Sequence, residues 1–92
     1  MKVHQKGFLL QQLGSADRLW DVTLIERLLQ FYGLSGRYWE NNTRTTLDEL
    51  AAGGLISPVD HRLSERGEHK QLNIEYVLTD FGRERMRDTG LL

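Results

Sequence analysis

Residues 41–79, NNTRTTLDELAAGGLISPVDHRLSERGEHKQLNIEYVLT, form the stretch of sequence that decides the fold. The first part has apolar residues at helical spacing followed by two glycines, which predicts a helix over 42–52. The last part, 72–79, alternates apolar with polar residues and predicts a strand with one buried face. A polar segment around Gly67 joins that strand to an earlier one over 55–63. The stretch therefore predicts a helix followed by a β-hairpin.

The same periodicities predict which side chains of this stretch face the core. On the helix, one face carries Thr43, Leu47, Leu50 and Ala51. On the hairpin, the predicted inward residues are Val59, Leu63, Leu72, Ile74, Tyr76 and Leu78. Pro58 lacks a backbone N–H donor, so we expect the first strand to lie at a sheet edge or to be irregular near this residue.

The chain before this stretch predicts two more helices. Apolar residues at helical spacing mark one helix over 4–13 and another over 23–32. The second helix begins with Thr23 and Glu26 in the spacing of a capping box, and a glycine follows its last residue. Between the two helices, Leu19–Trp20 is predicted to form a very short strand.

The segment 34–40, LSGRYWE, is long for the turn between the two helices of a helix-turn-helix. Either the turn is enlarged, with Asn41 or its neighbour as the N-cap of the next helix, or that helix begins early, near Ser35. We favour the enlarged turn. We interpret Tyr38 and Trp39 as core or dimer-interface residues rather than as side chains that stack on bases.

A last helix is predicted over 80–88, with Thr79 or Asp80 as its cap. Phe81 and Met86 are its candidate apolar contacts. The predicted order is then helix, strand, helix, helix, strand, strand, helix, in one domain that takes up all 92 residues. Helices that cover a small antiparallel sheet define the α+β class.

The composition limits the class of function. The chain has 12 lysine and arginine residues against 13 aspartate and glutamate residues, so any contact with nucleic acid must come from a local basic patch. Cysteine is absent, which excludes disulfides and thiolate metal ligands. No apolar run approaches the ~20 residues of a membrane span, and the N-terminal run is too short for a signal peptide. We therefore expect a cytoplasmic protein with no membrane partner.

Neither a metal site nor an active site is indicated by the sequence. The histidines, His4, His61 and His69, do not have the spacing of metal ligands, and no carboxylate cluster completes a site. The sequence also has no glycine-rich phosphate loop and no nucleophile motif, and a single small core leaves little room for a deep pocket. We expect no cofactor, no metal and no catalytic activity.

Two segments of the sequence resemble a known family. LDELAAGGLI, from Leu47 to Ile56, is similar to the end of the recognition helix in many bacterial winged-helix regulators. YVLTDFGRERM, from Tyr76 to Met86, is similar to the segment in which their second wing strand enters a C-terminal helix. Regulators of the MarR and PadR kinds show both segments. The resemblance covers about residues 41–88 and implies an α+β winged helix-turn-helix with a three-helix core and a β-wing.

This resemblance implies binding to double-stranded DNA and a role in transcription regulation, of a bacterial or phage kind. Winged-helix regulators insert the N-terminal half of the recognition helix into the major groove, which assigns helix 42–52 to the groove and hairpin 55–78 to the wing. A homodimer would form through helix 4–13 and helix 80–88. Asn, Arg and Thr can contact adenine, guanine and the thymine methyl group, respectively. The predicted DNA-binding residues are Arg37, Asn41, Asn42, Thr43, Arg44, Thr45, Thr46, Arg66 and Lys70.

The same residues also have purely structural interpretations. Asn and Thr can simply cap a helix, and Arg44 can be solvated. Arg66 and Lys70 can keep the edge of the hairpin from aggregating. In that case the alternative function is a winged-helix protein–protein interaction module or adaptor subunit, which the near-neutral charge and the Tyr38–Trp39 pair favour.

Overall fold

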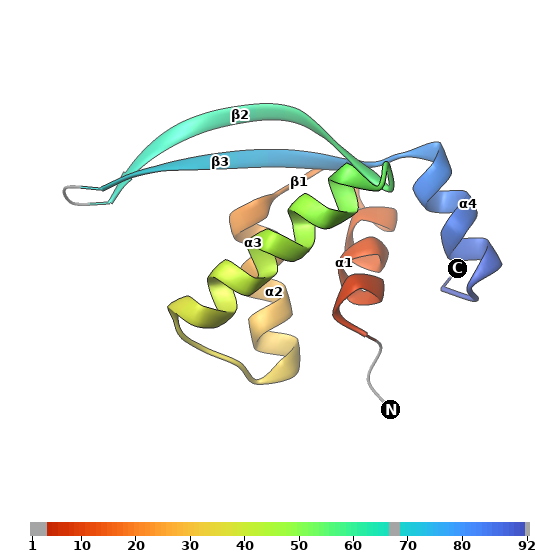
Figure 1. The fold of residues 1–92 in the computed structure, drawn as a ribbon, viewed down its shortest axis with the longest axis horizontal. Coiled ribbons are helices and arrows are strands. Elements are labelled where there is room, and N and C mark those ends of the chain that lie inside the picture. Colours follow the sequence, from red (N-terminus) through yellow and green to blue (C-terminus); the bar gives the residue numbers. More distant parts are fainter. Residues whose placement is uncertain (1–3, 67–68, 92) are drawn as a thin grey trace.

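The structure is a computed structural model that describes residues 4–66 and 69–91, without the side chains of Arg66 and His69. The elements follow the predicted order, and the α+β prediction is confirmed. They are α1 (Gln5–Gly14), β1 (Leu19–Trp20), α2 (Asp21–Tyr32), α3 (Arg37–Ala52), β2 (Ile56–Arg66), β3 (His69–Leu78) and α4 (Asp80–Asp88) (Figure 1). The polar tip predicted around Gly67 lies outside the described residues. Within the described ranges, no helix combines the length and the apolar character that crossing a membrane requires.

The described strands form a three-stranded antiparallel sheet in the order β1-β3-β2. β3 is therefore the central strand, and β2 lies at an edge. The register of β2 on β3 shifts between Pro58 and Asp60, which makes Val59 an extra residue in the strand. The prediction for Pro58 is confirmed on both counts, because a residue without an N–H donor cannot complete a central ladder.

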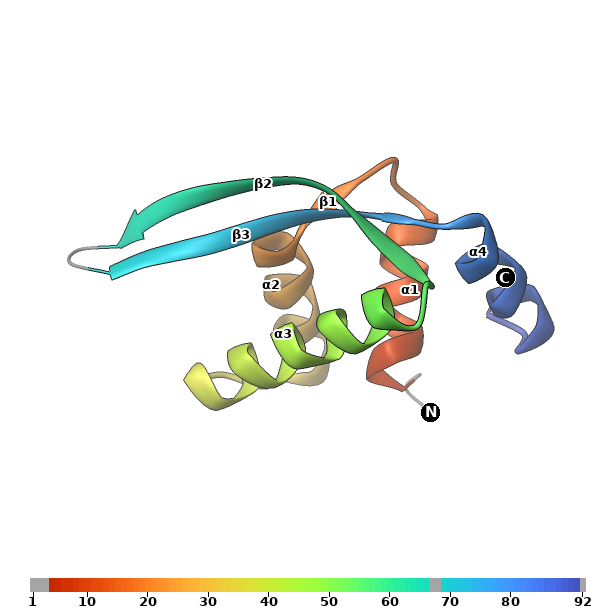
Figure 2. The ribbon, with the colours of Figure 1, turned by 45° about the horizontal axis from the view of Figure 1, so that its top comes forward.

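The hydrophobic core lies between the sheet and the helices, with α4 beyond the end of the sheet where β2 begins and β3 ends (Figure 2). Each fully buried leucine-sized side chain contributes about 1.5–3 kcal/mol. The predicted inner face of α3 is confirmed, because Thr43, Leu47 and Leu50 are buried and Ala51 packs at the margin. The core residues are Phe8, Leu9, Leu10, Leu13, Leu24, Leu28, Leu47, Leu50, Ile56, Tyr76 and Met86.

α2 begins earlier than its sequence predicts. The first helical residue is Asp21, and Trp20 before it is the N-cap in an extended conformation. The predicted capping box of Thr23 and Glu26 is wrong, because both residues lie inside the helix. At the other end, Gly33 adopts a left-handed conformation with a φ of 67°, so the predicted glycine stop is confirmed.

α3 also begins early, at Arg37, so the enlarged turn is wrong and the alternative with an early start is closer. The reason is Gly36, the N-cap, whose φ of 102° is open to glycine and strained for other residues. The chain can therefore reverse sharply at Gly36 and enter the helix at once. As a consequence Tyr38 lies on the first turn of α3 and is 69% exposed, so it is not a core residue. Trp39 is half-buried.

The inward residues predicted for β2 are wrong. Val59 and Leu63 are 45% and 66% exposed. Val59 is the extra residue at the register shift. Leu63 lies farther along the arm of the hairpin, which extends past the helices (Figure 1). The hairpin is longer than the core beneath it, so alternation alone does not bury every apolar residue of the strand.

The alternation of β3 is confirmed only in part. Tyr76 is buried and Ile74 half-buried, as predicted, but Leu72 is half exposed. Asn73 and Glu75, on the opposite face, are buried as well. β1 explains the burial of Glu75, because Trp20 is its cross-strand neighbour and Arg18 bonds its carboxylate at 3.4 Å. The short first strand thus covers a face that the pattern assigns to solvent.

α4 begins as predicted, because the Thr79 hydroxyl oxygen accepts a hydrogen bond from the Gly82 N–H at 2.9 Å. Met86 is buried, but Phe81 is half exposed, so only one of the two predicted apolar contacts is correct. A Cβ atom on Gly82 would overlap the carbonyl oxygen of Leu55. The close approach of α4 to the start of β2 therefore requires a glycine at this position.

Candidate functional site

α3, whose ribbon lies below the hairpin strands in Figure 1, carries one exposed stripe of residues. Arg37, Asn41, Thr45 and Asp48 are exposed and recur at a spacing of three or four residues, opposite the buried Thr43. The N-terminal half of the stripe is neutral or basic. The acid of the stripe is Asp48, and Glu40, in the first turn of α3, is exposed outside the stripe. The exposed stripe can therefore accept an anionic surface only at its N-terminal half.

The threonines of α3 use their hydroxyl groups inside the helix. The Thr43, Thr45 and Thr46 hydroxyls donate to carbonyl oxygens four residues earlier, at 2.8, 3.1 and 3.0 Å. Thr43 has no exposed surface, so its predicted role as a DNA contact is wrong and it is a core residue. Thr46 and Asn42 are half-buried at the margin of the helix, whereas Asn41 and Thr45 are exposed.

Arg44 is not a solvated or free side chain. Its Nη1 lies 2.7 Å from Oδ2 of Asp21, and its side chain is only 26% exposed. With the Gln71 amide turned so that its oxygen faces Arg44, that oxygen accepts hydrogen bonds from Nε, at 3.2 Å, and from Nη2. The guanidinium is thus held by a carboxylate on α2 and an amide on β3. Its predicted role as a base contact conflicts with this geometry.

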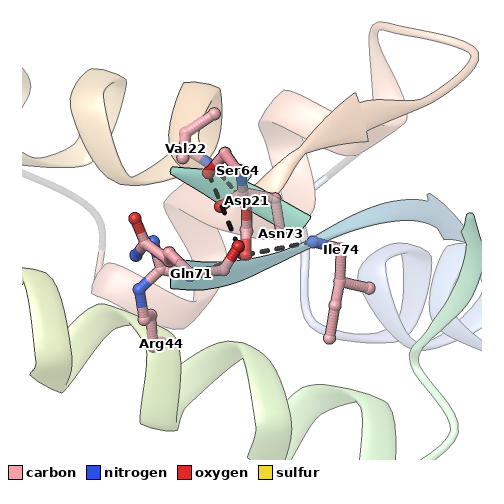
Figure 3. A network of polar contacts seen from close by, with 7 residues as sticks. All are labelled: Asp21, Val22, Arg44, Ser64, Gln71, Asn73 and Ile74. Carbon is pink, nitrogen blue, oxygen red and sulfur yellow. Dashed lines mark hydrogen bonds and ion pairs between the residues drawn. The ribbon is translucent and has the colours of Figure 1, made fainter. Parts of the chain in front are cut away.

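Asp21 is the centre of the polar network in Figure 3. Its side chain is 4% exposed. Oδ1 accepts the N–H of Val22 at 2.7 Å, and Oδ2 accepts the N–H of Ile74 at 3.2 Å in addition to Arg44. Sequence reasoning missed Asp21, because it lies in a connector between predicted elements. The available signal was an acidic residue just before an apolar helix, because a negative charge at a helix N-terminus interacts favourably with the helix dipole.

The hairpin carries a second small polar cluster next to this network (Figure 3). Asn73 Nδ2 donates to the Ser64 hydroxyl oxygen at 2.8 Å. The Ser64 hydroxyl in turn donates to the backbone carbonyl oxygen of Gln71 at 3.5 Å. Asn73 is 3% exposed, and its Oδ1 has no donor among the described residues. These contacts tie β2 to β3 midway along the arm.

The charges of the hairpin are mixed in sign. Lys70 is exposed and faces Glu65 across the ladder. Arg62 lies over the Trp20 ring, 4.3 Å from its centroid, which occupies that guanidinium in a cation–π contact. The side chain of Arg66 lies outside the described residues, so its predicted role is unchanged. Among the described hairpin residues, Lys70 is the cation that sequence reasoning assigned to a phosphate contact.

Exposed apolar side chains accompany these charges. Leu63 and Leu72 are cross-strand neighbours on the arm, and they are 66% and 50% exposed. Tyr38 on the first turn of α3 is exposed and packs edge-on against Trp39, with ring centroids 5.0 Å apart. Sequence reasoning placed both leucines in the core, so this apolar pair was not foreseen.

The arrangement of these elements defines the class of the fold. Three helices, α1 to α3, lie beneath a small antiparallel sheet. The hairpin that follows the third helix supplies two of the three strands of this sheet. This is the winged helix-turn-helix fold, with α3 in the position of the recognition helix and β2–β3 as the wing.

Two solved structures of RosR have a similar fold. A structure of H. salinarum RosR, from crystals grown from NaBr, superposes with a TM-score of 0.65 at 22% identity, over 96% of this chain and 70% of that one. A complex structure of hsRosR-S1 superposes with a TM-score of 0.63 at 24% identity, over 97% of this chain and 69% of that one. No protein-family model and no curated protein matches the sequence. The similarity supports the winged-helix fold but not the resemblance to MarR and PadR regulators, and these archaeal neighbours do not support a bacterial or phage kind.

Proposed function

We propose that this protein is a winged-helix regulator of transcription that binds double-stranded DNA. The observation that carries the proposal is the exposed stripe of α3, whose N-terminal half bears Arg37, Asn41 and Thr45, with Glu40 of the first turn as the exposed acid beside them. This is the half of the helix that enters the major groove in helix-turn-helix proteins. The winged-helix fold shared with the solved structures of RosR supports this assignment of α3 and the hairpin.

The proposed contacts follow from exposure and chemistry. Asn41 pairs with an adenine edge, and Thr45 contacts a thymine methyl group or a phosphate. Arg37, at the first turn of α3, contacts a guanine or a backbone phosphate. Lys70 and Arg66 contact phosphates from the wing. Asn42 and Thr46, at the margin of the helix, contribute phosphate contacts at most.

A homodimer would give this small module enough interface for sequence specificity. The surface we propose for it is formed by α1 and α4, between which a cavity of about 340 Å³ opens. Leu10, Leu55 and Leu91 supply its apolar lining. Two copies of α3 in such a dimer would read half-sites one helical turn apart, about 34–36 Å.

The test is a selection of duplexes from a random pool, followed by fluorescence anisotropy on one half-site. We expect Arg37→Ala to weaken binding about tenfold, the typical loss for one good base or phosphate contact. Arg27→Ala is the matched control, because Arg27 is also an exposed helical arginine but lies on α2, outside α3 and the proposed dimer surface. If no duplex is enriched, and none binds at low salt where the electrostatic attraction is largest, the protein does not bind DNA.

A second candidate function rests on the exposed Leu63–Leu72 pair. Exposed apolar neighbours rimmed by charge are typical of protein interfaces. A winged-helix interaction module would use this arm of the hairpin instead of α3. The two functions separate in one experiment, because Leu63→Thr leaves DNA binding unchanged under the first and abolishes partner binding under the second.

A further inference from the structure

We propose that Asp21 and Arg44 are positioning residues that set the wing relative to α3. In this role Arg44 does not read a base. The part of the inference that concerns DNA rests on the proposed function. The part that concerns the position of the hairpin does not.

The geometry puts one buried oxygen atom between two elements of the candidate interface (Figure 3). Oδ2 of Asp21 is 2.7 Å from Nη1 of Arg44 on α3, and it accepts the N–H of Ile74 on β3 at 3.2 Å. The other oxygen, Oδ1, is held by the first turn of α2 itself. The carboxylate is therefore fixed to α2 by one oxygen and joins α3 to the hairpin by the other.

The bond to Ile74 continues the sheet where β1 ends. Leu19 and Trp20 pair with Tyr76 and Glu75 of β3, so the next residue along would pair with Ile74. At that point the chain turns into α2, and the side chain of Asp21 takes over the role of a strand carbonyl. An N–H group that the short strand leaves unpaired is thereby satisfied, which a buried strand requires.

Arg44 supplies a second point of attachment to the hairpin. With the Gln71 amide turned so that its oxygen faces Arg44, that oxygen accepts hydrogen bonds from Nε and Nη2. Gln71 lies on the same strand as Ile74 but three residues closer to the start of β3. The planar guanidinium can donate to the carboxylate and the amide at the same time, because its N–H groups point in fixed directions. The arm that carries Lys70 is thus attached directly beside that residue.

The space around Arg44 is not closely packed, so the position of the hairpin relative to α3 depends on these polar contacts. A cavity of about 270 Å³ borders Arg44 and Gln71 on one side, next to Val22 and Ile25. A second cavity, of about 150 Å³, borders Asp21 and Arg44 on the other side. Continuous apolar packing therefore does not fill the space between α3 and this part of the hairpin. The position of the arm depends on the Asp21–Arg44–Gln71 contacts instead.

The experiment measures the position of the wing without DNA. The chain has no cysteine, so cysteines introduced at Ala52 and Glu65, both exposed, can carry two spin labels. We expect a narrow distance distribution in the parent protein and a broadened or shifted one in Asp21→Asn and Arg44→Lys. Glu49→Gln is the matched control, because it removes an exposed ion pair, to Lys6 at 3.1 Å, outside this network. Gln71→Met tests the second attachment if Asp21→Asn does not fold.

An unchanged distance distribution in folded Arg44→Lys and Gln71→Met would overturn the inference. DNA binding gives an independent reading. We expect Arg44→Lys to weaken binding to all duplexes by a similar factor, about tenfold, with no loss of preference at any one base pair. A relaxed preference at a single base pair would instead make Arg44 a base-reading residue. If the parent protein binds no duplex while the variants change the distance between the labels, the proposed function is refuted and the positioning role stands.

Discussion

Tyr76 lies where the sheet meets the polar network, and burial raises the pKa of its phenol above the usual value near 10. The carboxylates of Asp48 and Asp21 raise this pKa further, and Arg44 opposes them. A pKa that is raised in the folded state gives stability that is complete below pH 10 and is lost as the pH rises toward the folded value. The same phenol that completes the core therefore limits the protein at alkaline pH.

We expect Tyr76→Phe to lose less stability than the parent protein between pH 8 and pH 11, because only the parent has the Tyr76 phenol, which ionises more readily once the chain unfolds. The measurement is the free energy of unfolding by denaturant at each pH, taken as the difference between the two proteins. Tyr32, whose pKa is also raised by burial, titrates in both and cancels. A difference that stays constant across this range would contradict the assigned pKa shift.

Leu63 and Leu50 test the corrected account of which leucines form the core. Leu63 is 66% exposed and Leu50 is 3% exposed, although the sequence pattern assigns both to the interior. We expect Leu63→Ala to change the free energy of unfolding by at most about 0.5 kcal/mol and Leu50→Ala to lower it by about 2–5 kcal/mol. Similar losses from both substitutions, measured by denaturant unfolding, would mean that the arm of the hairpin is covered.

At the scale of elements, α4 depends on one glycine. A Cβ at Gly82 would overlap the Leu55 carbonyl oxygen and approach a Leu78 methyl group to 2.8 Å, so α4 or the start of β2 must shift. We expect Gly82→Ala to destabilise the protein by about 1–3 kcal/mol, the usual cost of overpacking. Gly14→Ala is the control, because its Cβ would meet only side chains at 3.6 Å or beyond. Equal midpoints of thermal unfolding for the two variants would contradict this packing.

The sequence predicts the elements whose signals are local. The glycine after α2, the Thr79 cap of α4 and the inner face of α3 each depend on a few neighbouring residues, and all three are confirmed. The start of α3 was predicted wrongly. It depends on the positive φ of Gly36, and the local sequence does not determine that conformation. The hairpin leucines were placed wrongly, because the pattern cannot reveal that the arm is longer than the core.

The candidate site was harder to predict than the fold. Arg44 and Asp21 are 23 residues apart, and nothing in either local sequence indicates that they meet. Arg44 and Thr43 were chosen for their position at the start of a helix, whereas the structure uses one for an ion pair and buries the other. Asn41 and Thr45 are in an exposed stripe, as a contact with DNA requires. The residue types at the start of α3 selected the candidates, and only the tertiary structure separated the exposed ones from the buried ones.

For the whole molecule, a net charge of −1 means that attraction to DNA depends on a few cations. The salt dependence of the affinity gives the number of phosphates that these cations neutralise, because each one adds about 0.9 to the steepness of log affinity against log salt concentration. We expect a shallow slope for one protomer, and Lys70→Ala should reduce it by about one. Anisotropy titrations between 50 and 200 mM salt measure this change. If Lys70→Ala leaves this slope unchanged, Lys70 does not contact a phosphate and the hairpin is not part of the DNA interface.

The most direct test of the DNA-binding surface is a titration of the isotope-labelled protein with a selected duplex, followed by amide shifts in NMR spectra. We expect the largest changes at Arg37, Asn41 and Thr45 on α3 and at Lys70 on the hairpin, with α1 and α4 unaffected by a single half-site. An unperturbed α3 at low salt, or changes confined to α1 and α4, would contradict the proposed DNA interface.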